Sequence, residues 1–220
     1  MNAREKILGK IRDAQLRSNA NNGASVENTL SIAQHLAQHP RGPQPPVIGD
    51  LLKNFKERCL KLSSDVLETT NRGDVPNLVA RYLNEKNLPT QGVCWPLLSA
   101  LPWREAGLDI QSRPSNSQDA VGVTGAFCAI AETGTLMTLS GKETPPSTSL
   151  LPETHVAILE PSRIVASMED AWELVRKEFK QPPRVVNFIS GPSRTADIEM
   201  TVTMGAHGPY RVLVIIAPLT

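Results

Sequence analysis

Residues that could hold an anionic ligand are concentrated in the segment Ser190 to Glu199, which follows an apolar stretch typical of a strand. Gly191 would let backbone N–H groups approach a ligand, and the guanidinium of Arg194 forms a planar fork that suits a carboxylate or a phosphate. Ser193 and Thr195 carry hydroxyls that can donate hydrogen bonds to the same anion. We therefore predict an anion site here, beyond the carboxyl end of the strand. A helix beginning near Ser193 would add a favourable N-terminus, whereas simple helix capping by Ser193 is the alternative.

Two acids and a histidine extend this set. Asp197 and Glu199 are two positions apart, so they would lie together on an extended segment but not on one helical face. His207 lies in the constrained loop from Gly205 to Pro209, next to Gly208, and could contact an anion or transfer a proton. An ion pair and a loop-bracing histidine are the alternatives. The spacings of zinc proteases and of phosphate-binding loops do not occur, so no bound metal is predicted.

A third candidate is the tetrapeptide Glu132-Thr133-Gly134-Thr135. Gly134 supplies the backbone freedom of a tight turn between two strands. A carboxylate held at such a turn and partly desolvated can act as a nucleophile or as an acid or base, which makes Glu132 a candidate catalytic residue together with His207. A turn with a solvated glutamate is the simpler alternative.

The hydrophobic pattern predicts the elements that must position these residues. Strands are expected at residues 66–69, 92–95, 108–111, 122–131, 135–139, 155–159, 185–189 and 211–216. Helices are expected at residues 52–62, 75–84 and 168–179, with a helical turn at 98–106. Strand–helix alternation indicates an α/β fold with a mostly parallel sheet and flanking helices. Residues 122–131 and 135–139 would form an antiparallel hairpin, and residues 142–151 a loop.

The first 46 residues are expected to form an arm outside this domain. Residues 2–17 have the pattern of an amphipathic helix, with Ile7 and Ile11 on one face. A polar stretch, residues 18–25, and a proline-rich extended linker follow. The predicted division is thus 1–46 for the arm and 47–220 for the domain. The arm could be a loosely docked helix or a partner-binding element.

Composition narrows the possible partners. The chain has 220 residues, of which 40% are hydrophobic and 4% aromatic, and its formal net charge is +1. Without a positive field or aromatic stacking platforms, nucleic acid and acidic membranes are not expected partners. The N-terminus lacks the apolar core of a signal peptide, and no apolar run could span a bilayer, so a cytoplasmic location is predicted. Cys59, Cys94 and Cys128 lack the clustered spacing of iron–sulfur ligands and are expected to be buried.

Four segments together resemble the lactate-utilisation protein C family, whose domain is the LUD domain. The resemblance runs over residues 50–218 and is carried by Ala131 to Thr135, Ser149 to Pro152 with His155, Ser190 to Glu199, and Gly205 to Pro209. It implies a NagB/RpiA/CoA-transferase-like fold and a role with two iron–sulfur proteins in the oxidation of L-lactate to pyruvate. The clusters would be on the partners, with no cofactor bound by this chain.

Three hypotheses follow. The first is a non-redox subunit of a lactate-oxidising system that binds a small anionic ligand near Glu132, Arg194 and His207. The second is a stand-alone enzyme of the CoA-transferase or sugar-phosphate isomerase type that uses Glu132. Its turn is similar to the Glu-Asn-Gly turn of family I CoA-transferases, although Thr133 replaces the asparagine and the glycine-rich CoA loops are not seen. The third is a scaffold whose motif residues only brace loops.

Overall fold

The computed structural model describes residues 3–22, 32, 34–39, 41–43, 49–195 and 203–219. The chain divides into two compact units, residues 1–44 and 45–220. In the first unit, α1 (Ala3–Asn22) continues through residues 18–22, which we expected to lie beyond the helix. Once a helix is nucleated, each further residue adds a backbone hydrogen bond, which lets the polar end continue it. Among the described residues, no helix is long and apolar enough to cross a membrane.

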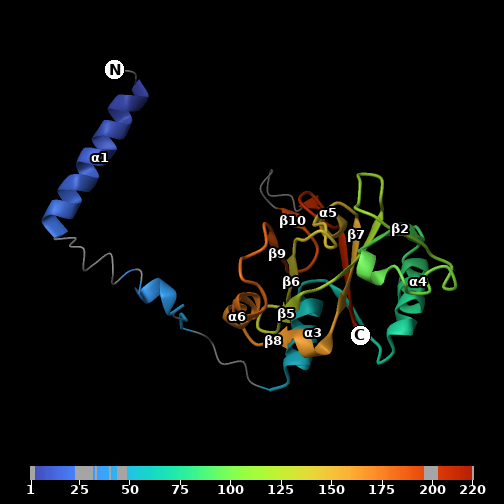
Figure 1. Ribbon diagram of the computed structural model, residues 1–220. Helices are drawn as coiled ribbons and strands as arrows, with labels where there is room; N and C mark the ends of the chain where they lie inside the picture. The colour runs from blue at the N-terminus through green and yellow to red at the C-terminus, as the bar shows by residue number, and fades with distance from the viewer. Residues whose placement is uncertain are drawn as a thin grey trace. The chain divides into compact units, whose positions relative to one another are not determined.

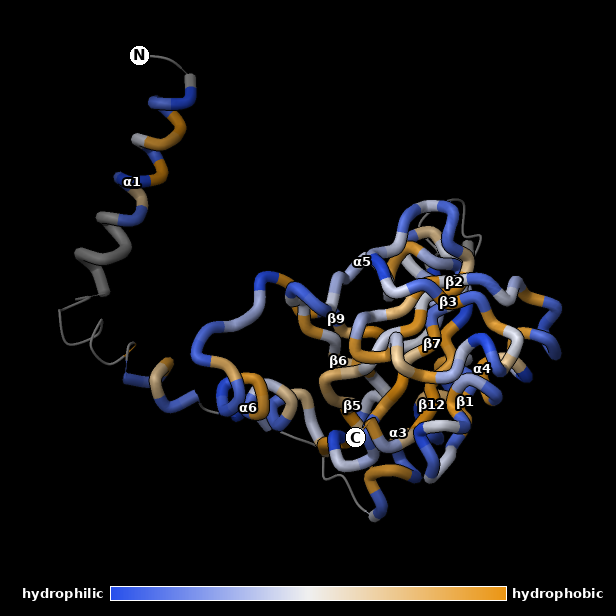
Figure 2. The backbone as a smooth tube through the Cα atoms, turned by 45° about the vertical axis from the view of Figure 1, so that its right-hand side comes forward, coloured by the Kyte–Doolittle hydropathy of each residue, from blue (hydrophilic) through white to orange (hydrophobic). Residues whose placement is uncertain are grey.

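The second unit is built on a six-stranded sheet in which every neighbouring pair is parallel. Its strands, in spatial order, are β1 (Asp65–Glu68), β12 (Arg211–Ile216), β7 (Thr154–Leu159), β4 (Val121–Gly125), β2 (Gln91–Cys94) and β3 (Asp109–Ser112). Figure 2 shows that apolar residues are concentrated along the central strands β7 and β12. The predicted α/β fold with a mostly parallel sheet is confirmed.

Two helices cover the two faces of this main sheet. Alternate residues of β12 point to opposite faces. Leu213 and Ile215 pack in one core cluster with α4 (Val75–Glu85), while Val212 and Val214 pack in another with α3 (Leu51–Lys61). Burying each such side chain contributes about 1.5–3 kcal/mol, so these two faces hold the sheet and helices together.

A second, four-stranded sheet packs beyond α3. Its order is β8 (Ile164–Val165), β5 (Cys128–Ile130), β6 (Thr135–Leu139) and β9 (Val186–Ile189). Ala129, Leu136 and Ile189 share a core cluster with α3 and with the main sheet, so α3 contacts both sheets. The outer face of the second sheet is covered by α6 (Met168–Glu178) through Val175. Figure 1 shows α6 and α4 on opposite sides of the domain.

Two expectations about strands were wrong. The run 122–131 is not one strand, because it is divided between the sheets at Ala126. The backbone N–H of Ala126 donates to Ile158 of the main sheet at 2.9 Å, and that of Phe127 donates to Met137 of the second sheet at 2.8 Å. The strand expected at 185–189 is β9, which pairs antiparallel with β6 and does not belong to the parallel sheet. The antiparallel hairpin itself is present, formed by β5 and β6.

The remaining elements are short. The loop expected at 142–151 contains α5 (Ser147–Leu150), and the helical turn expected at 98–106 is reduced to the 3₁₀ turn η2 (Pro96–Leu98) followed by irregular turns. The others are η1 (Arg72–Asp74), η3 (Pro161–Arg163), β10 (Arg194–Thr195) and β11 (Thr203–Met204).

One histidine is fully buried in the main sheet. His155 lies in β7 on the same side as Ala157, and its Nε2 is 2.8 Å from the hydroxyl of Thr124 on β4. Its Nδ1 has no hydrogen-bond partner among the described residues. Burial disfavours the charged imidazolium, which lowers the pKa of His155 from 6.5 to about 4.

We expect this histidine to destabilise the fold in mild acid. Between pH 6.5 and pH 4 the unfolded chain binds a proton at His155 and the folded chain does not, so the free energy of unfolding falls with the pH by about 3 kcal/mol. Urea denaturation followed by tryptophan fluorescence at stepped pH, with NMR titration of the imidazole, measures this. The variant His207→Gln, at an exposed histidine, should keep the same pH dependence. A folded-state His155 that titrates near pH 6.5 would contradict the expectation.

Candidate functional site

Two of the segments singled out in the sequence meet at the last turn of α3. A Cβ on Gly134 would lie 2.6 Å from Cβ of Arg58, and a Cβ on Gly191 would lie 2.5 Å from the carbonyl oxygen of Leu62. Both glycines have positive φ, +67° and +83°. Only glycine combines that conformation with so close an approach. The hairpin turn and the segment after β9 are therefore both seated on one helical turn.

The end of this helix also receives Arg194. The helix stops at Leu62, and Ser63 adopts a left-handed conformation with φ +64°. The hydroxyl of Ser63 accepts a hydrogen bond from Nη2 of Arg194. The rest of the Arg194 side chain is exposed, so its guanidinium is available at the surface. Sequence reasoning did not assign a role to Ser63, because nothing in its local sequence marks it.

A chain of hydroxyls ties the hairpin turn to the segment after β9. The Thr133 hydroxyl donates to that of Thr135 at 2.8 Å, and the Thr135 and Ser190 hydroxyls are 2.6 Å apart. Thr135 is buried, whereas Thr133 and Ser190 are exposed, so these bonds are partly shielded from water. The structure thus brings three of the predicted residues, Thr133, Gly134 and Thr135, next to Gly191. The contacts that these three residues make in the structure are with other residues of the chain.

Glu132 has a structural partner. Its carboxylate accepts a hydrogen bond of 3.2 Å from the backbone N–H of Met168, the first residue of α6, and its own N–H donates to Ala166. A carboxylate at a helix N-terminus is stabilised by the unpaired N–H groups and by the helix dipole. Ser167 and Asp170 cap the same helix end with a capping box. This contact with α6 was not predicted from the sequence.

Ser193 organises the loop that carries His207. No helix begins at Ser193; instead β10 pairs antiparallel with β11. The Ser193 N–H donates to Pro209 and its carbonyl accepts from Gly205, each at 2.9 Å. Its hydroxyl accepts from the backbone N–H of His207 at 3.2 Å. A helix beginning near Ser193, which the sequence left open, is not present, because the serine hydroxyl fixes a loop and does not cap a helix.

The predicted site residues are only partly assembled. Gly208 lies across from Ser193, and the side chain of His207 is exposed. Within the described part of the chain, no hydrogen bond or ion pair joins Glu132, Arg194 and His207. Asp197 and Glu199 lie outside the described residues, as does the side chain of Thr195. In that same described part, no three His, Cys, Asp or Glu side chains come together as metal ligands.

These segments lie at the amino-terminal edge of the main sheet. The last turn of α3 leads into the start of β1, and the loop 205–209 leads into the start of β12. The segment from Ser190 does follow the carboxyl end of its strand, as expected, but that strand, β9, belongs to the second sheet and not to the parallel one.

A pocket of about 310 Å³ opens beside this loop. It is lined by Leu151, Glu153, Gly205, Gly208, Tyr210 and Arg211. The guanidinium of Arg211 lies over the Tyr210 ring at 4.8 Å, and its Nη1 is 3.8 Å from Glu153 Oε2. Sequence reasoning missed Arg211, which reads only as the first residue of a strand. The signal that could have found it is its position directly after the loop.

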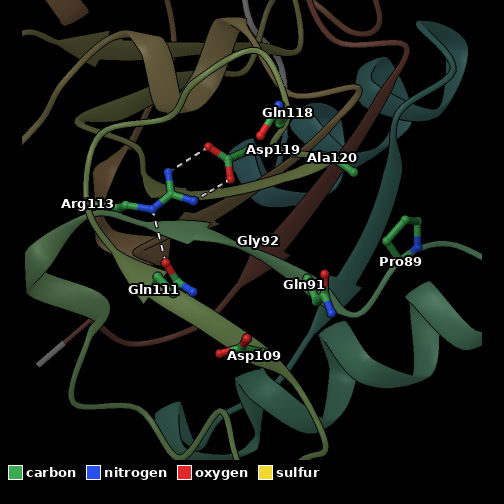
Figure 3. A pocket seen from close by; sticks show the side chains of 9 residues that line it. All are labelled: Pro89, Gln91, Gly92, Asp109, Gln111, Arg113, Gln118, Asp119 and Ala120. Atoms are coloured by element: carbon green, nitrogen blue, oxygen red, sulfur yellow. Dashed lines mark hydrogen bonds and ion pairs between the residues drawn. The ribbon is translucent and has the colours of Figure 1, made fainter.

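A second pocket, of about 270 Å³, lies at the starts of β2, β3 and β4. Figure 3 shows the guanidinium of Arg113 facing the carboxylate of Asp119, with Gln111 beside it. Two bonds of 2.8 and 2.7 Å form this pair, and they hold the pKa of Asp119 below its ordinary value. Because the pair is satisfied within the protein, Arg113 braces the pocket wall and its charge is already neutralised.

Comparison of this chain with known proteins identifies the class to which its fold and its motifs belong. A family model described as the LUD domain matches residues 103–217. Lactate utilization protein C of Bacillus subtilis is 31% identical over 76% of this chain and 78% of its own length. The protein of the same name from Bacillus licheniformis is 26% identical over 97% and 95%. The chain therefore belongs to the LUD-domain family of the lactate utilization C proteins, and the resemblance seen in the sequence is confirmed.

A solved structure supports the fold. The crystal structure of a DUF162 family protein from Deinococcus radiodurans superimposes with a TM-score of 0.56. It is 22% identical and covers 76% of this chain and 96% of its own. At this identity the likeness supports the arrangement of the elements alone.

We expect the glycine contacts on α3 to be required for stability. Gly134→Ala and Gly191→Ala should each lower the free energy of unfolding by ~2 kcal/mol more than Gly107→Ala, because the new methyl group collides with backbone. Gly107 also has positive φ, +77°, but a Cβ there meets nothing within 4 Å. It therefore isolates the conformational cost of about 1–2 kcal/mol. Equal losses in all three variants, measured by urea denaturation, would show that the close contact is unimportant.

Proposed function

We propose that this protein is a component of a lactate-utilisation system that oxidises L-lactate to pyruvate in the cytoplasm. The observation that carries the proposal is the match to lactate utilization protein C of Bacillus subtilis at 31% identity over 76% of the chain. Two of the segments that mark the family resemblance, the one with Gly134 and the one with Gly191 and Arg194, also meet at one place, the end of α3. Such convergence is expected if they serve one shared task.

The electron-carrying groups would be on iron–sulfur partner proteins. Cys59, Cys94 and Cys128 are all buried, and each belongs to a different core cluster. Burial raises the pKa of these thiols to about 12, 11 and 12. A cluster needs several thiolates close together, so these cysteines are suited to core packing. The chain would then contribute ligand binding and docking to the system.

The ligand would be a small anion at the surface formed by Ser193, Arg194 and the loop 205–209. Arg194 offers an exposed guanidinium, and His207 an exposed imidazole that can take up or release a proton. Glu132 is less suited to proton transfer because its carboxylate already bonds to α6. The same contact disfavours a stand-alone enzyme with Glu132 as its nucleophile, and no other contact of this residue favours one.

Complementation tests this proposal. In a Bacillus subtilis strain that lacks its own lactate utilization protein C, this chain should restore growth on L-lactate. A tagged copy should co-purify with brown iron–sulfur proteins, and the eluate should reduce a dye when L-lactate is added. Arg194→Ala should lower this dye reduction severalfold. Arg176→Ala, which removes an exposed arginine from α6, away from the proposed site, should not lower it. A chain that neither restores growth nor brings down iron–sulfur partners would refute the proposed role.

A further inference from the structure

The guanidinium of Arg211 is held in place, but one of its nitrogens lacks a hydrogen-bond partner among the described residues. Its Nη1 atom is shielded from water and has no hydrogen-bond partner among the described residues. The Glu153 carboxylate, at 3.8 Å, is too far for a hydrogen bond, although it is close enough to attract the charge. Stacking on Tyr210 fixes the plane of the guanidinium. The Arg211 side chain as a whole is 31% exposed and lines the pocket, so an anionic acceptor that enters there can meet its charge.

Two other arginines show what a structurally satisfied guanidinium looks like in this fold. Arg113 forms two hydrogen bonds to Asp119. Arg163 forms two to Glu178, at 2.5 and 3.1 Å, and a third to a backbone carbonyl. Arg211 differs from both, because it lines a pocket and, in the part of the chain that the structure describes, no carboxylate forms a hydrogen bond to its Nη1. Arg211 is therefore positioned to bind an anion in the pocket.

The shape and charge of the pocket restrict what can enter. Its volume is about 310 Å³, near the lower end for small-molecule sites. Gly205 and Gly208 present no side chains on their part of the wall, and Leu151 and the Tyr210 ring offer apolar surface for a short alkyl group. Of the described residues, one guanidinium and one carboxylate line the space, and their charges balance. That balance favours a monoanion over a phosphate dianion, which needs more than one cation.

The Glu153 carboxylate supplies a second selection. Its side chain is 77% exposed, so it can shift to accommodate a ligand. A carboxylate accepts hydrogen bonds, and a hydroxyl next to the bound anion could donate one. A keto oxygen at the same position cannot donate a hydrogen bond, so it would be repelled by the carboxylate oxygens. The pocket therefore discriminates between a 2-hydroxy acid and the corresponding 2-oxo acid.

From these contacts we propose that this pocket binds a 2-hydroxy monocarboxylate, with Arg211 holding its carboxylate and Glu153 accepting a hydrogen bond from its 2-hydroxyl. The inference rests on the proposed function and names the ligand class and anchor of its site. Arg194, which does not line the pocket, then contributes only weaker, longer-range attraction.

Isothermal titration calorimetry of the full chain tests the assignment with L-lactate, pyruvate and inorganic phosphate as probes. L-lactate should bind more tightly than pyruvate or phosphate. Arg211→Lys keeps the charge but loses the planar fork, and should weaken L-lactate binding about tenfold or more. Glu153→Gln adds an amide donor, so pyruvate should then bind as well as L-lactate. Arg113→Lys is the matched control in the other pocket and should leave L-lactate affinity unchanged.

The assignment is overturned if the wild-type chain does not bind L-lactate, or if pyruvate or phosphate binds as tightly. It is also overturned if Arg211→Lys binds L-lactate normally, or if Arg194→Ala weakens binding more than Arg211→Lys does. Circular dichroism checks folding, and if Arg211→Lys is unfolded, the ligand preference of Glu153→Gln decides, because that position is exposed. L-lactate binding that depends on Arg211, in a chain that fails complementation, would refute the proposed function and leave this site standing.

Discussion

The arrangement of this domain depends on how closely two glycines approach the last turn of α3. Gly134 and Gly191 come from different parts of the chain. Because neither has a side chain, the backbone of each can lie directly against the same end of α3. That contact sets the position of the hairpin turn, and with it the buried Thr135 that bonds to Ser190. It also places the segment that begins β10, whose Arg194 reaches Ser63. Packing at one turn thus determines where the hairpin turn and the segment that begins β10 are displayed.

The helix that receives these contacts is itself held between two sheets. Phe55 and Cys59 of α3 share a core cluster with Leu159 of the main sheet and Leu136 of the second sheet. Because protein interiors are close-packed, a helix in this position can shift little without disturbing both neighbours. The polar surface is therefore built on a helix that packs against both sheets. A binding site benefits from such support, since side chains on a rigid base need less ordering when a ligand arrives.

Much of this architecture could be predicted from the sequence, and the failures have physical causes. Periodicity located α3, α4 and α6, because each buries a regular stripe of apolar residues, whereas the strand 211–216 was located as a continuous apolar run, typical of a strand buried on both faces. The run 122–131 is apolar throughout, and apolarity alone does not reveal that its hydrogen bonds go to two different sheets. The motif residues were found because glycine and hydroxyl residues are distinctive, but their contacts were not. Arg211 was missed because a lone cation at a strand start carries no local signal, and its stacking on Tyr210 appears only in three dimensions.

The passage of the chain at Ala126 has a consequence for how the molecule moves. Adjacent peptide N–H groups, those of Ala126 and Phe127, belong to the hydrogen-bond ladders of two separate sheets. With no linker between them, neither ladder can slip by a residue without pulling on the other. The two sheets should therefore fluctuate and exchange their amide hydrogens as one cooperative unit, with similar protection on either side of the junction. A signal that enters at the second sheet, where a partner could press on α6, would reach the central strand β4 through covalent bonds.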